Sequence, residues 1–131
     1  MSQKAMGDRI FSFEDLTVWQ KAVDFAELVI KEIDRFETPR KHYRLIEQLE
    51  AAATSASMNI AEGKGRFSKK EFIHYLYIAR GSVFECITIL VIVQRMRWIS
   101  DDVFKQIKSM GEEITKMLNS LIQSIKNSDK I

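Results

Sequence analysis

Basic side chains are the residues of this sequence best suited to bind another molecule, because lysine and arginine neutralise phosphates. Nine of them gather in short stretches and are the candidates for contacting nucleic acid: Arg40, Lys41, Arg44, Lys64, Arg66, Lys69, Lys70, Arg95 and Arg97. Aromatic rings beside them, at Tyr43 and Phe67, suit stacking on unpaired bases. The competing interpretation is that these cations only solvate loops and helix C-termini, since the net charge of the chain is a modest +2.

The sequence contains no complete motif for catalysis or for metal binding. Glu71 and His74 show the Glu-x-x-His spacing of di-iron helix bundles, but the second copy that such a site requires is absent. The glycines on either side of Lys64 lack the spacing of a P-loop. Cys86 lies in an apolar run, which indicates a packed side chain and not an activated thiol. The sequence therefore predicts a protein that is not an enzyme and uses no metal or cofactor.

Length and composition favour one cytoplasmic domain. A chain of 131 residues with 46% hydrophobic side chains can bury one core without disulfide bonds or a structural metal. Its single cysteine excludes a disulfide within the chain, which suits a reducing compartment. Residues 1–9 hold no apolar run typical of a signal peptide, and the longest apolar stretch, residues 86–93, is shorter than the roughly 20 residues that span a bilayer. We therefore expect no membrane segment.

Four helices are expected to position the basic residues, since one proline and five glycines permit long uninterrupted helices. Apolar residues recur at three- and four-residue steps in four segments. The predicted organisation is a flexible leader over 1–12, one bundle over 13–127 with helices at about 13–36, 39–63, 68–97 and 100–126, and a tail over 128–131. Short connections force neighbouring helices to be antiparallel, so the predicted fold is an all-α, up-down-up-down four-helix bundle.

Local signals support the helix ends. Thr38 is typical of an N-cap, with Pro39 at the first position of the second helix. Gly63 suits the left-handed residue that follows a helix. Ser68 opens a capping box before the third helix, and Ser100 is typical of an N-cap before the fourth. In such a bundle the basic stretches fall at its two ends.

The apolar run over residues 87–93 carries the most information about assembly. Its content of Ile and Val also suits a β-strand, although helical periodicity continues on both sides of it. As a helix, the run is apolar in every direction, so its outer face either meets water or is covered. One interpretation is a bulky core with one or two exposed residues. The other, which we favour, is a subunit interface at Ile89, Val91 and Ile92.

Three motifs resemble those of one known family. Residues 58–63 (MNIAEG), followed by Gly65, Arg66 and Ser68, resemble the signature of four-helix-bundle proteins first described in intervening sequences of 23S ribosomal RNA genes. Residues 13–22 look like the opening helix of that family, and residues 78–82 (IARGS) look like its third-helix motif. The matches span about residues 13 to 98 and keep the order and spacing of the family.

The resemblance implies a four-helix bundle assembled as a homopentameric ring. It also implies kinship with the accessory variability determinant of diversity-generating retroelements, which looks like a basic pentameric barrel that binds nucleic acid and a reverse transcriptase. Glu50 stands where family members often carry a basic residue, and His42 stands where glutamate is usual. These departures weaken the case for binding along the shaft of the barrel and leave its basic ends as the candidate surface.

The polar residues and glycines of the matched motifs suit a structural role: Asn59, Glu62, Gly63, Arg80, Gly81, Ser82 and Glu85. We expect Glu62 to pair with Arg66 or Arg80, and Asn59 to form a hydrogen bond across to the third helix. A glycine inside a helix costs about 1 kcal/mol relative to alanine, so Gly81 indicates a tight contact.

The sequence therefore predicts a non-enzymatic oligomer of identical chains that binds RNA, DNA or a nucleic-acid enzyme such as a reverse transcriptase through its basic ends. The alternative is an adaptor that binds another protein without contacting nucleic acid. A third hypothesis is a bundle that binds a small molecule or a metal.

Overall fold

The computed structural model of the chain describes residues 11–38 and 42–128, which form four α-helices and no strand. A short 3-10 turn, η2 (Ser12–Asp15), precedes α1 (Thr17–Ile33), α2 (Tyr43–Lys64), α3 (Lys69–Arg95) and α4 (Asp101–Asn127). The predicted all-α class with four helices is confirmed, and residues 87–93 belong to α3 and not to a β-strand. Most of the predicted leader and tail lies outside the described residues.

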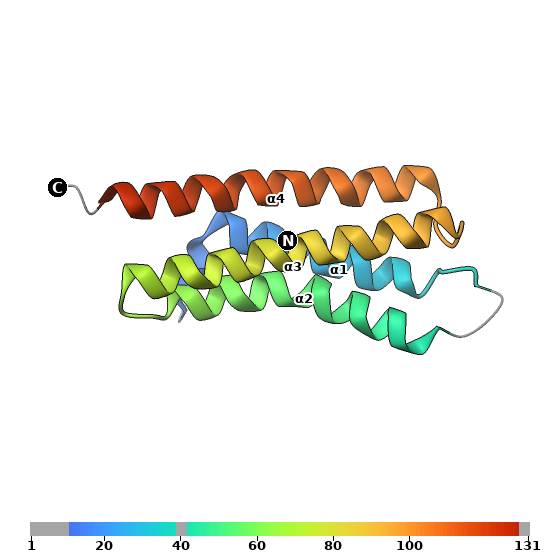
Figure 1. Ribbon diagram of the computed structural model, residues 1–131, viewed down its shortest axis with the longest axis horizontal. Coiled ribbons are helices and arrows are strands. Elements are labelled where there is room, and N and C mark those ends of the chain that lie inside the picture. The colour runs from blue at the N-terminus through green and yellow to red at the C-terminus, as the bar shows by residue number, and fades with distance from the viewer. Residues whose placement is uncertain (1–10, 39–41, 129–131) are drawn as a thin grey trace.

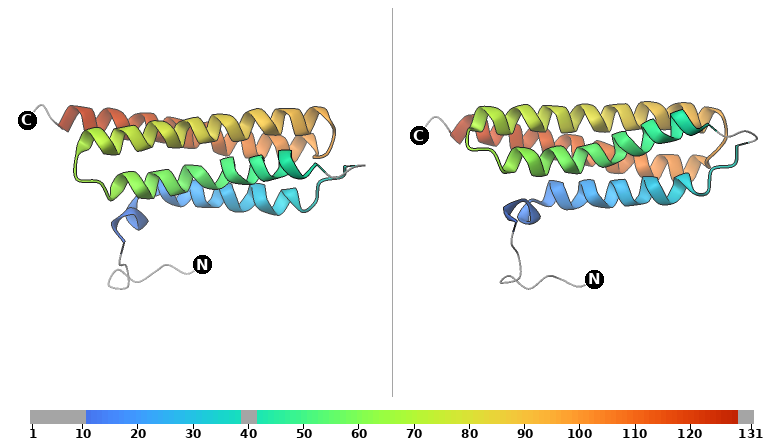
Figure 2. Two further views of the ribbon diagram at one scale, coloured as in Figure 1. Left: turned by 60° about the horizontal axis from the view of Figure 1, so that its bottom comes forward. Right: turned by 90° about the horizontal axis from the view of Figure 1, so that it is seen from below.

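The four helices lie side by side along the long axis of the molecule, and the chain reverses direction at each connection (Figure 1). α2 packs against α1 and α3, and α4 packs against α3 and α1, so the helices surround one core (Figure 2). The α2–α3 connection lies at the same end of the bundle as the last turn of α4 (Figure 1). The α1–α2 and α3–α4 connections lie at the opposite end.

The core forms because each helix places apolar side chains at three- and four-residue steps on one face. The largest fully buried side chains come from all four helices: Phe25, Leu49, Ile60, Leu76, Leu90, Ile107, Ile114 and Leu118. α2 also buries three small residues, Ala52, Ala53 and Ala56, and α3 buries Ala79. Small side chains let helices approach closely, and α2 and α3 are the most extensively packed pair of helices.

Gly63 allows the closest approach between α2 and α3. A Cβ atom placed on it would lie 2.8 Å from the Cβ of Tyr75 and 3.2 Å from the carbonyl oxygen of Phe72. The prediction that Gly63 ends the helix in a left-handed conformation was wrong, because α2 continues to Lys64 and no described glycine has a positive φ. Gly63 is thus required by helix packing and not by a turn.

The connection between α1 and α2 is longer than the sequence predicted. α1 ends at Ile33, and α2 begins at Tyr43 instead of residue 39. The cause is Trp98, a buried residue of the α3–α4 connection. Its carbonyl oxygen accepts a hydrogen bond from the Glu37 N–H (3.3 Å), and its ring lies 4.5 Å, centroid to centroid, from that of His42.

The outcome for the predicted N-caps differs between the helices. Thr38 does not stand directly before α2, whose N-cap position is taken by His42. Pro39 lies outside the described residues. The other two predicted N-caps are confirmed: the Ser68 hydroxyl accepts from the Glu71 N–H (3.1 Å), and the Ser100 hydroxyl accepts from the Val103 N–H (3.2 Å).

The structure divides the predicted interface of residues 87–93. Ile89 is only 5% exposed and packs in the core of its own chain, so its assignment to a subunit interface was wrong. Val91 is half-buried, and Ile92 remains 46% exposed. Because α3 packs against both α2 and α4, most of its apolar surface is already covered within one chain. Phe84, 52% exposed, adds an apolar side chain to the uncovered part of α3.

By length and composition, α3 could also cross a membrane, with a mean hydropathy of 1.9 over 18 residues. The longest apolar stretch, residues 86–93, does not reveal this property, because polar residues interrupt the apolar ones along α3. A helix in contact with two neighbours needs a similar composition to fill a core. Since 44% of this window is buried inside the bundle, packing accounts for much of the hydropathy of α3.

Candidate nucleic-acid interface

The candidate basic residues form separate clusters at the two ends of the bundle. Lys64, Arg66, Lys69 and Lys70 surround the α2–α3 connection, and Arg44, Arg95 and Arg97 lie near the opposite end. Arg40 and Lys41 lie outside the described residues. The 27 residues of α3 make a helix of about 40 Å, so one chain cannot join the two clusters into one surface.

The backbone around the α2–α3 connection is held at several points. We call residues 64–70 the α2–α3 tip. The N–H of Gly65 donates to the carbonyl of Ala61 (3.3 Å), and the N–H of Arg66 donates to the carbonyl of Gly63 (3.1 Å). On the other side of the tip, Ser68 caps α3. The basic side chains therefore project from a short turn that is fixed on both sides.

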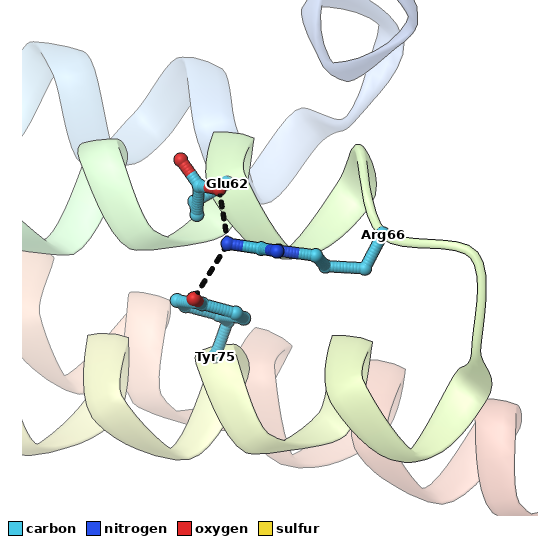
Figure 3. A network of polar contacts seen from close by, with 3 residues as sticks. All are labelled: Glu62, Arg66 and Tyr75. Atoms are coloured by element: carbon cyan, nitrogen blue, oxygen red, sulfur yellow. Dashed lines mark hydrogen bonds and ion pairs between the residues drawn. The ribbon is translucent and has the colours of Figure 1, made fainter.

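Arg66 is held against the body of the bundle by two side chains (Figure 3). Its Nη2 donates to Glu62 Oε2 at 2.6 Å and to the Tyr75 hydroxyl at 2.8 Å, and its Cζ lies 4.9 Å from the centre of the Tyr75 ring. The structure thus gives Glu62 the first of its two expected partners. An ion pair this exposed adds little stability, so its main effect is to orient the guanidinium.

The α2–α3 tip is rich in positive charge. Lys69 and Lys70 are exposed, and Lys64 is half-buried with its Nζ 5.9 Å from the centre of the Phe72 ring. The two neighbouring carboxylates are engaged locally, Glu62 with Arg66 and Glu71 with the Ser68 hydroxyl. Four cations against two bonded carboxylates favour an anionic partner.

Lys126, in the last turn of α4, adds a cation at this end of the bundle. Its Nζ donates to the Tyr77 hydroxyl of α3 at 3.1 Å, which ties α4 to α3 below the tip. Positive charge at this end therefore comes from three of the four helices.

The opposite end has mixed charge. Arg44, Arg95 and Arg97 are exposed, but carboxylates lie in the same region, including Glu37 and Asp101. Arg97 has a left-handed conformation, with φ of 64°, that ends α3. The next N–H, of Trp98, donates to the Val93 carbonyl (3.1 Å), which is the hydrogen bond of a Schellman motif. Arg97 thus has a structural reason to occupy this place, and the α2–α3 tip is the stronger candidate surface.

Of the matched serine and asparagine, only Ser82 links α2 to α3. Asn59 Nδ2 donates to the carbonyl (2.8 Å) and hydroxyl (2.9 Å) of Ser55 within α2, so the prediction that it reaches α3 was wrong. Ser55 makes the link instead, because its hydroxyl lies 2.8 Å from that of Ser82 on α3. Glu85 also joins the two helices, accepting from Gln48 Nε2 at 3.4 Å.

Arg80 connects α3 to α4 and not to Glu62. Its Nη1 donates to Asn119 Oδ1 at 2.8 Å, and its Cζ lies 4.9 Å from the centre of the Tyr77 ring and 5.8 Å from that of Phe84. Gly81, beside it, has no atom within 4 Å of an added Cβ. Within one chain, the expected tight contact at Gly81 is therefore absent.

The candidates for catalysis and metal binding, Cys86 and His74, pack against other side chains. Cys86 is buried, and burial, followed by the nearby charge of Glu85, raises the pKa of its thiol to about 12. A thiol with that pKa is not an activated nucleophile. No group of three His, Cys, Asp or Glu side chains within residues 11–38 and 42–128 could hold a metal ion. The His74 ring packs edge-on against Tyr75 instead.

A groove between α3 and α4 was missed by sequence reasoning. It has a volume of about 580 Å³ and a mostly apolar lining that includes Val83, Phe84 and Ile87. The charged residues that line it are Lys108, Glu112 and Lys116. Gly111 forms part of its floor, where an added Cβ would lie 3.1 Å from Ile87 Cδ1. The sequence held no clear signal of it, because the groove depends on which side chains of α3 the packing of α4 leaves uncovered.

Comparison with known proteins agrees with this architecture. Residues 14–120 match the protein family described as 23S rRNA-intervening sequence protein. A solved structure of a protein of unknown function from the S23 ribosomal protein family of Bacteroides thetaiotaomicron VPI-5482 is similar, with a TM-score of 0.75 and 26% identity. That similarity covers 81% of this chain and 98% of the other. No curated protein is significantly similar to the chain.

Proposed function

This chain belongs to the 23S rRNA-intervening sequence protein family, and from that premise we propose that it is a non-enzymatic protein that binds nucleic acid, or a protein that processes nucleic acid, through its basic ends. The observation that carries the proposal is the α2–α3 tip, where Arg66 is oriented by Glu62 and Tyr75, three lysines surround it, and both nearby carboxylates are bonded locally. Phosphate groups are the partners that such a surface attracts most strongly. A reverse transcriptase is the kind of nucleic-acid enzyme we propose as a protein partner.

We further propose that the antiparallel up-down-up-down bundle assembles with identical copies into a homopentameric ring in the cytoplasm, without a membrane. The outer surface of α3 supports self-association, because Phe84 and Ile92 remain half-exposed and Val91 is only half-buried. Gly81 on the same helix leaves open space that a neighbouring subunit would fill. Assembly multiplies the tip, so weak contacts at each copy add up along one polymer.

The test of nucleic-acid binding is a titration of a labelled RNA or DNA strand by fluorescence anisotropy over a range of salt concentrations. The affinity of the wild-type protein falls as salt rises, and Lys69→Gln with Lys70→Gln lowers the slope by about 0.7 for each lysine that contacts a single strand. The matched control removes two exposed lysines from the shaft of α4, Lys105→Gln with Lys108→Gln, and leaves the slope unchanged. Absent or salt-independent binding by the wild-type protein contradicts the proposal.

A protein-binding adaptor is the second candidate function, and the groove between α3 and α4 favours it. Its mostly apolar lining and its two lysines suit an amphipathic helix with acidic residues. An adaptor keeps its protein partner after nuclease treatment and loses it on Phe84→Arg, whereas the tip variants have no effect. Loss of the partner on nuclease treatment would exclude this function.

A further inference from the structure

Phe67 stands out because its side chain is fully exposed, at 106% relative exposure, whereas the next most exposed large apolar residue, Tyr43, reaches 67%. Burying a phenylalanine side chain is favourable by about 1.5–3 kcal/mol. A chain that leaves such a ring in water at the end of its bundle forgoes that stabilisation. Isolated exposed apolar residues are common, so further observations are needed to give this ring a role.

The first such observation is a local contact that the sequence encodes and the structure does not make. Phe67 directly precedes the N-cap Ser68, and Phe72 occupies the fourth position of α3. Apolar residues at these two places normally pack together as a hydrophobic staple. Here Phe72 packs against the core and approaches Gly63, while the ring of Phe67 stays in solvent. Such departures from local rules are expected at functional sites.

The second observation is that the neighbours of Phe67 are fixed. Arg66 is bonded to Glu62 and Tyr75 (Figure 3). The Ser68 hydroxyl accepts from the Glu71 N–H at the start of α3. The ring is therefore carried outward by a turn whose two flanking residues are held. The backbone that carries the ring therefore loses little conformational freedom on binding, which favours contact with a ligand.

The third observation is the composition of the surrounding surface. Within the α2–α3 tip, Phe67 is the one aromatic residue, and four of the other six residues are Lys64, Arg66, Lys69 and Lys70. Proteins that bind single-stranded nucleic acid combine these two features, with cations that follow the phosphates and an aromatic ring on which a base stacks.

We propose that the α2–α3 tip binds single-stranded nucleic acid, with Phe67 stacking on an unpaired base and the surrounding lysines contacting the flanking phosphates. This inference rests on the proposed function and names its substrate class. A base within a duplex is stacked on its neighbours and is not accessible to the ring. A membrane surface is less well matched, because membrane binding strengthens with the apolar area that is buried, and Phe67 is the one apolar side chain of the α2–α3 tip.

The experiment compares a labelled single strand with its perfectly paired duplex. A length of about 15 nucleotides is close to the longest stretch that a single-strand-binding domain covers. Phe67→Leu keeps the apolar character and removes the ring. It weakens binding to the single strand about tenfold, as expected from the 1–3 kcal/mol that one stacked base contributes, and leaves the duplex affinity and the salt slope unchanged. Phe67→Trp retains single-strand binding, because its ring also stacks.

Three variants or probes complete the design. Tyr43→Leu removes an exposed ring at the opposite end. A loss of single-strand binding as large as that of Phe67→Leu would overturn the assignment of stacking to the α2–α3 tip. Lys69→Gln with Lys70→Gln weakens binding to both nucleic acids and reduces the salt slope. Vesicles of phosphatidylserine and phosphatidylcholine test the membrane alternative with the same proteins.

The outcomes separate this inference from the function on which it rests. Salt-sensitive binding that Phe67→Leu leaves intact, or weakens equally for single strand and duplex, overturns stacking and keeps nucleic-acid binding. A wild-type protein that binds neither nucleic acid overturns both. Vesicle binding that depends on Phe67, without binding to either nucleic acid, replaces this inference with a membrane surface.

Discussion

Gly63→Ala tests the helix packing that supports the α2–α3 tip. The added methyl group would lie 2.8 Å from Tyr75 Cβ, 3.0 Å from Phe72 Cδ1 and 3.2 Å from the Phe72 carbonyl oxygen. A Cβ and a backbone oxygen cannot move without moving α3, so the substitution forces the two helices apart. Overpacking of this kind costs about 1–3 kcal/mol, and the higher helix propensity of alanine returns about 0.5–1 kcal/mol. The two ranges together allow a net loss of up to about 2.5 kcal/mol. Because the close contacts include a Cβ and a backbone oxygen, which cannot move alone, we expect a loss of unfolding free energy of about 1–2 kcal/mol.

Urea denaturation followed by circular dichroism measures this loss. All variants are compared at one chain concentration, because self-association shifts apparent stability. For a domain of this size, the expected loss corresponds to a melting temperature lower by about 4–8 °C. The matched control is Gly65→Ala, whose added Cβ would meet nothing closer than 3.6 Å and which has an ordinary φ of −81°, so its stability changes by less than about 0.5 kcal/mol.

A Gly63→Ala protein as stable as wild type would contradict the close approach of α2 and α3 at Gly63, since the two helices would then have room for the added methyl group. An equal loss in Gly65→Ala would refute it as well. Because Tyr75 holds Arg66, the separation of α2 and α3 also weakens nucleic-acid binding at the tip.

The remaining predictions concern other parts of the bundle. Arg97→Gly raises the unfolding free energy by about 1 kcal/mol, because a left-handed φ of 64° costs an arginine energy that glycine does not lose; a lower melting temperature would contradict this. Cys86 stays unmodified by a thiol reagent at pH 8 in the native protein and reacts on unfolding, and rapid native labelling would contradict its burial. Since folding raises its pKa from 9.0 to about 12, the stability contributed by the protonated thiol is complete below pH 9 and is lost as pH rises towards 12, which pH-dependent urea denaturation measures against Cys86→Ala. Phe84→Asp with Ile92→Asp separates the assembly into folded single chains in sedimentation velocity, whereas Val23→Asp on α1 does not; an unchanged assembly would exclude the outer surface of α3 as the contact.

The helices and two of their N-caps were predictable because they depend on residues close together in the sequence. Apolar side chains at three- and four-residue steps predict α3 and α4, and the hydroxyls of Ser68 and Ser100 accept from the N–H groups three residues ahead. The start of α2 was not predictable in this way. It depends on Trp98, which meets His42 and Glu37 from the α3–α4 connection, far along the chain.

The candidate site was predictable in its location and not in its details. Antiparallel neighbours place the basic stretches at opposite ends, so the cluster at the α2–α3 connection follows from the sequence. The contact of Arg66 with Tyr75 and the exposure of Phe67 do not, because both depend on how closely α2 approaches α3 at Gly63. Motif resemblance identified Gly63 as important while the usual rule for helix ends gave it the wrong role.

Native mass spectrometry of the protein mixed with a short unpaired RNA strand tests most directly whether this chain acts as an oligomer that binds nucleic acid. We expect a particle of five chains of 15.2 kDa each with RNA bound, and loss of the RNA as the ammonium acetate concentration rises. A particle of one 15.2 kDa chain that carries no RNA at any salt concentration would contradict both the assembly and the function.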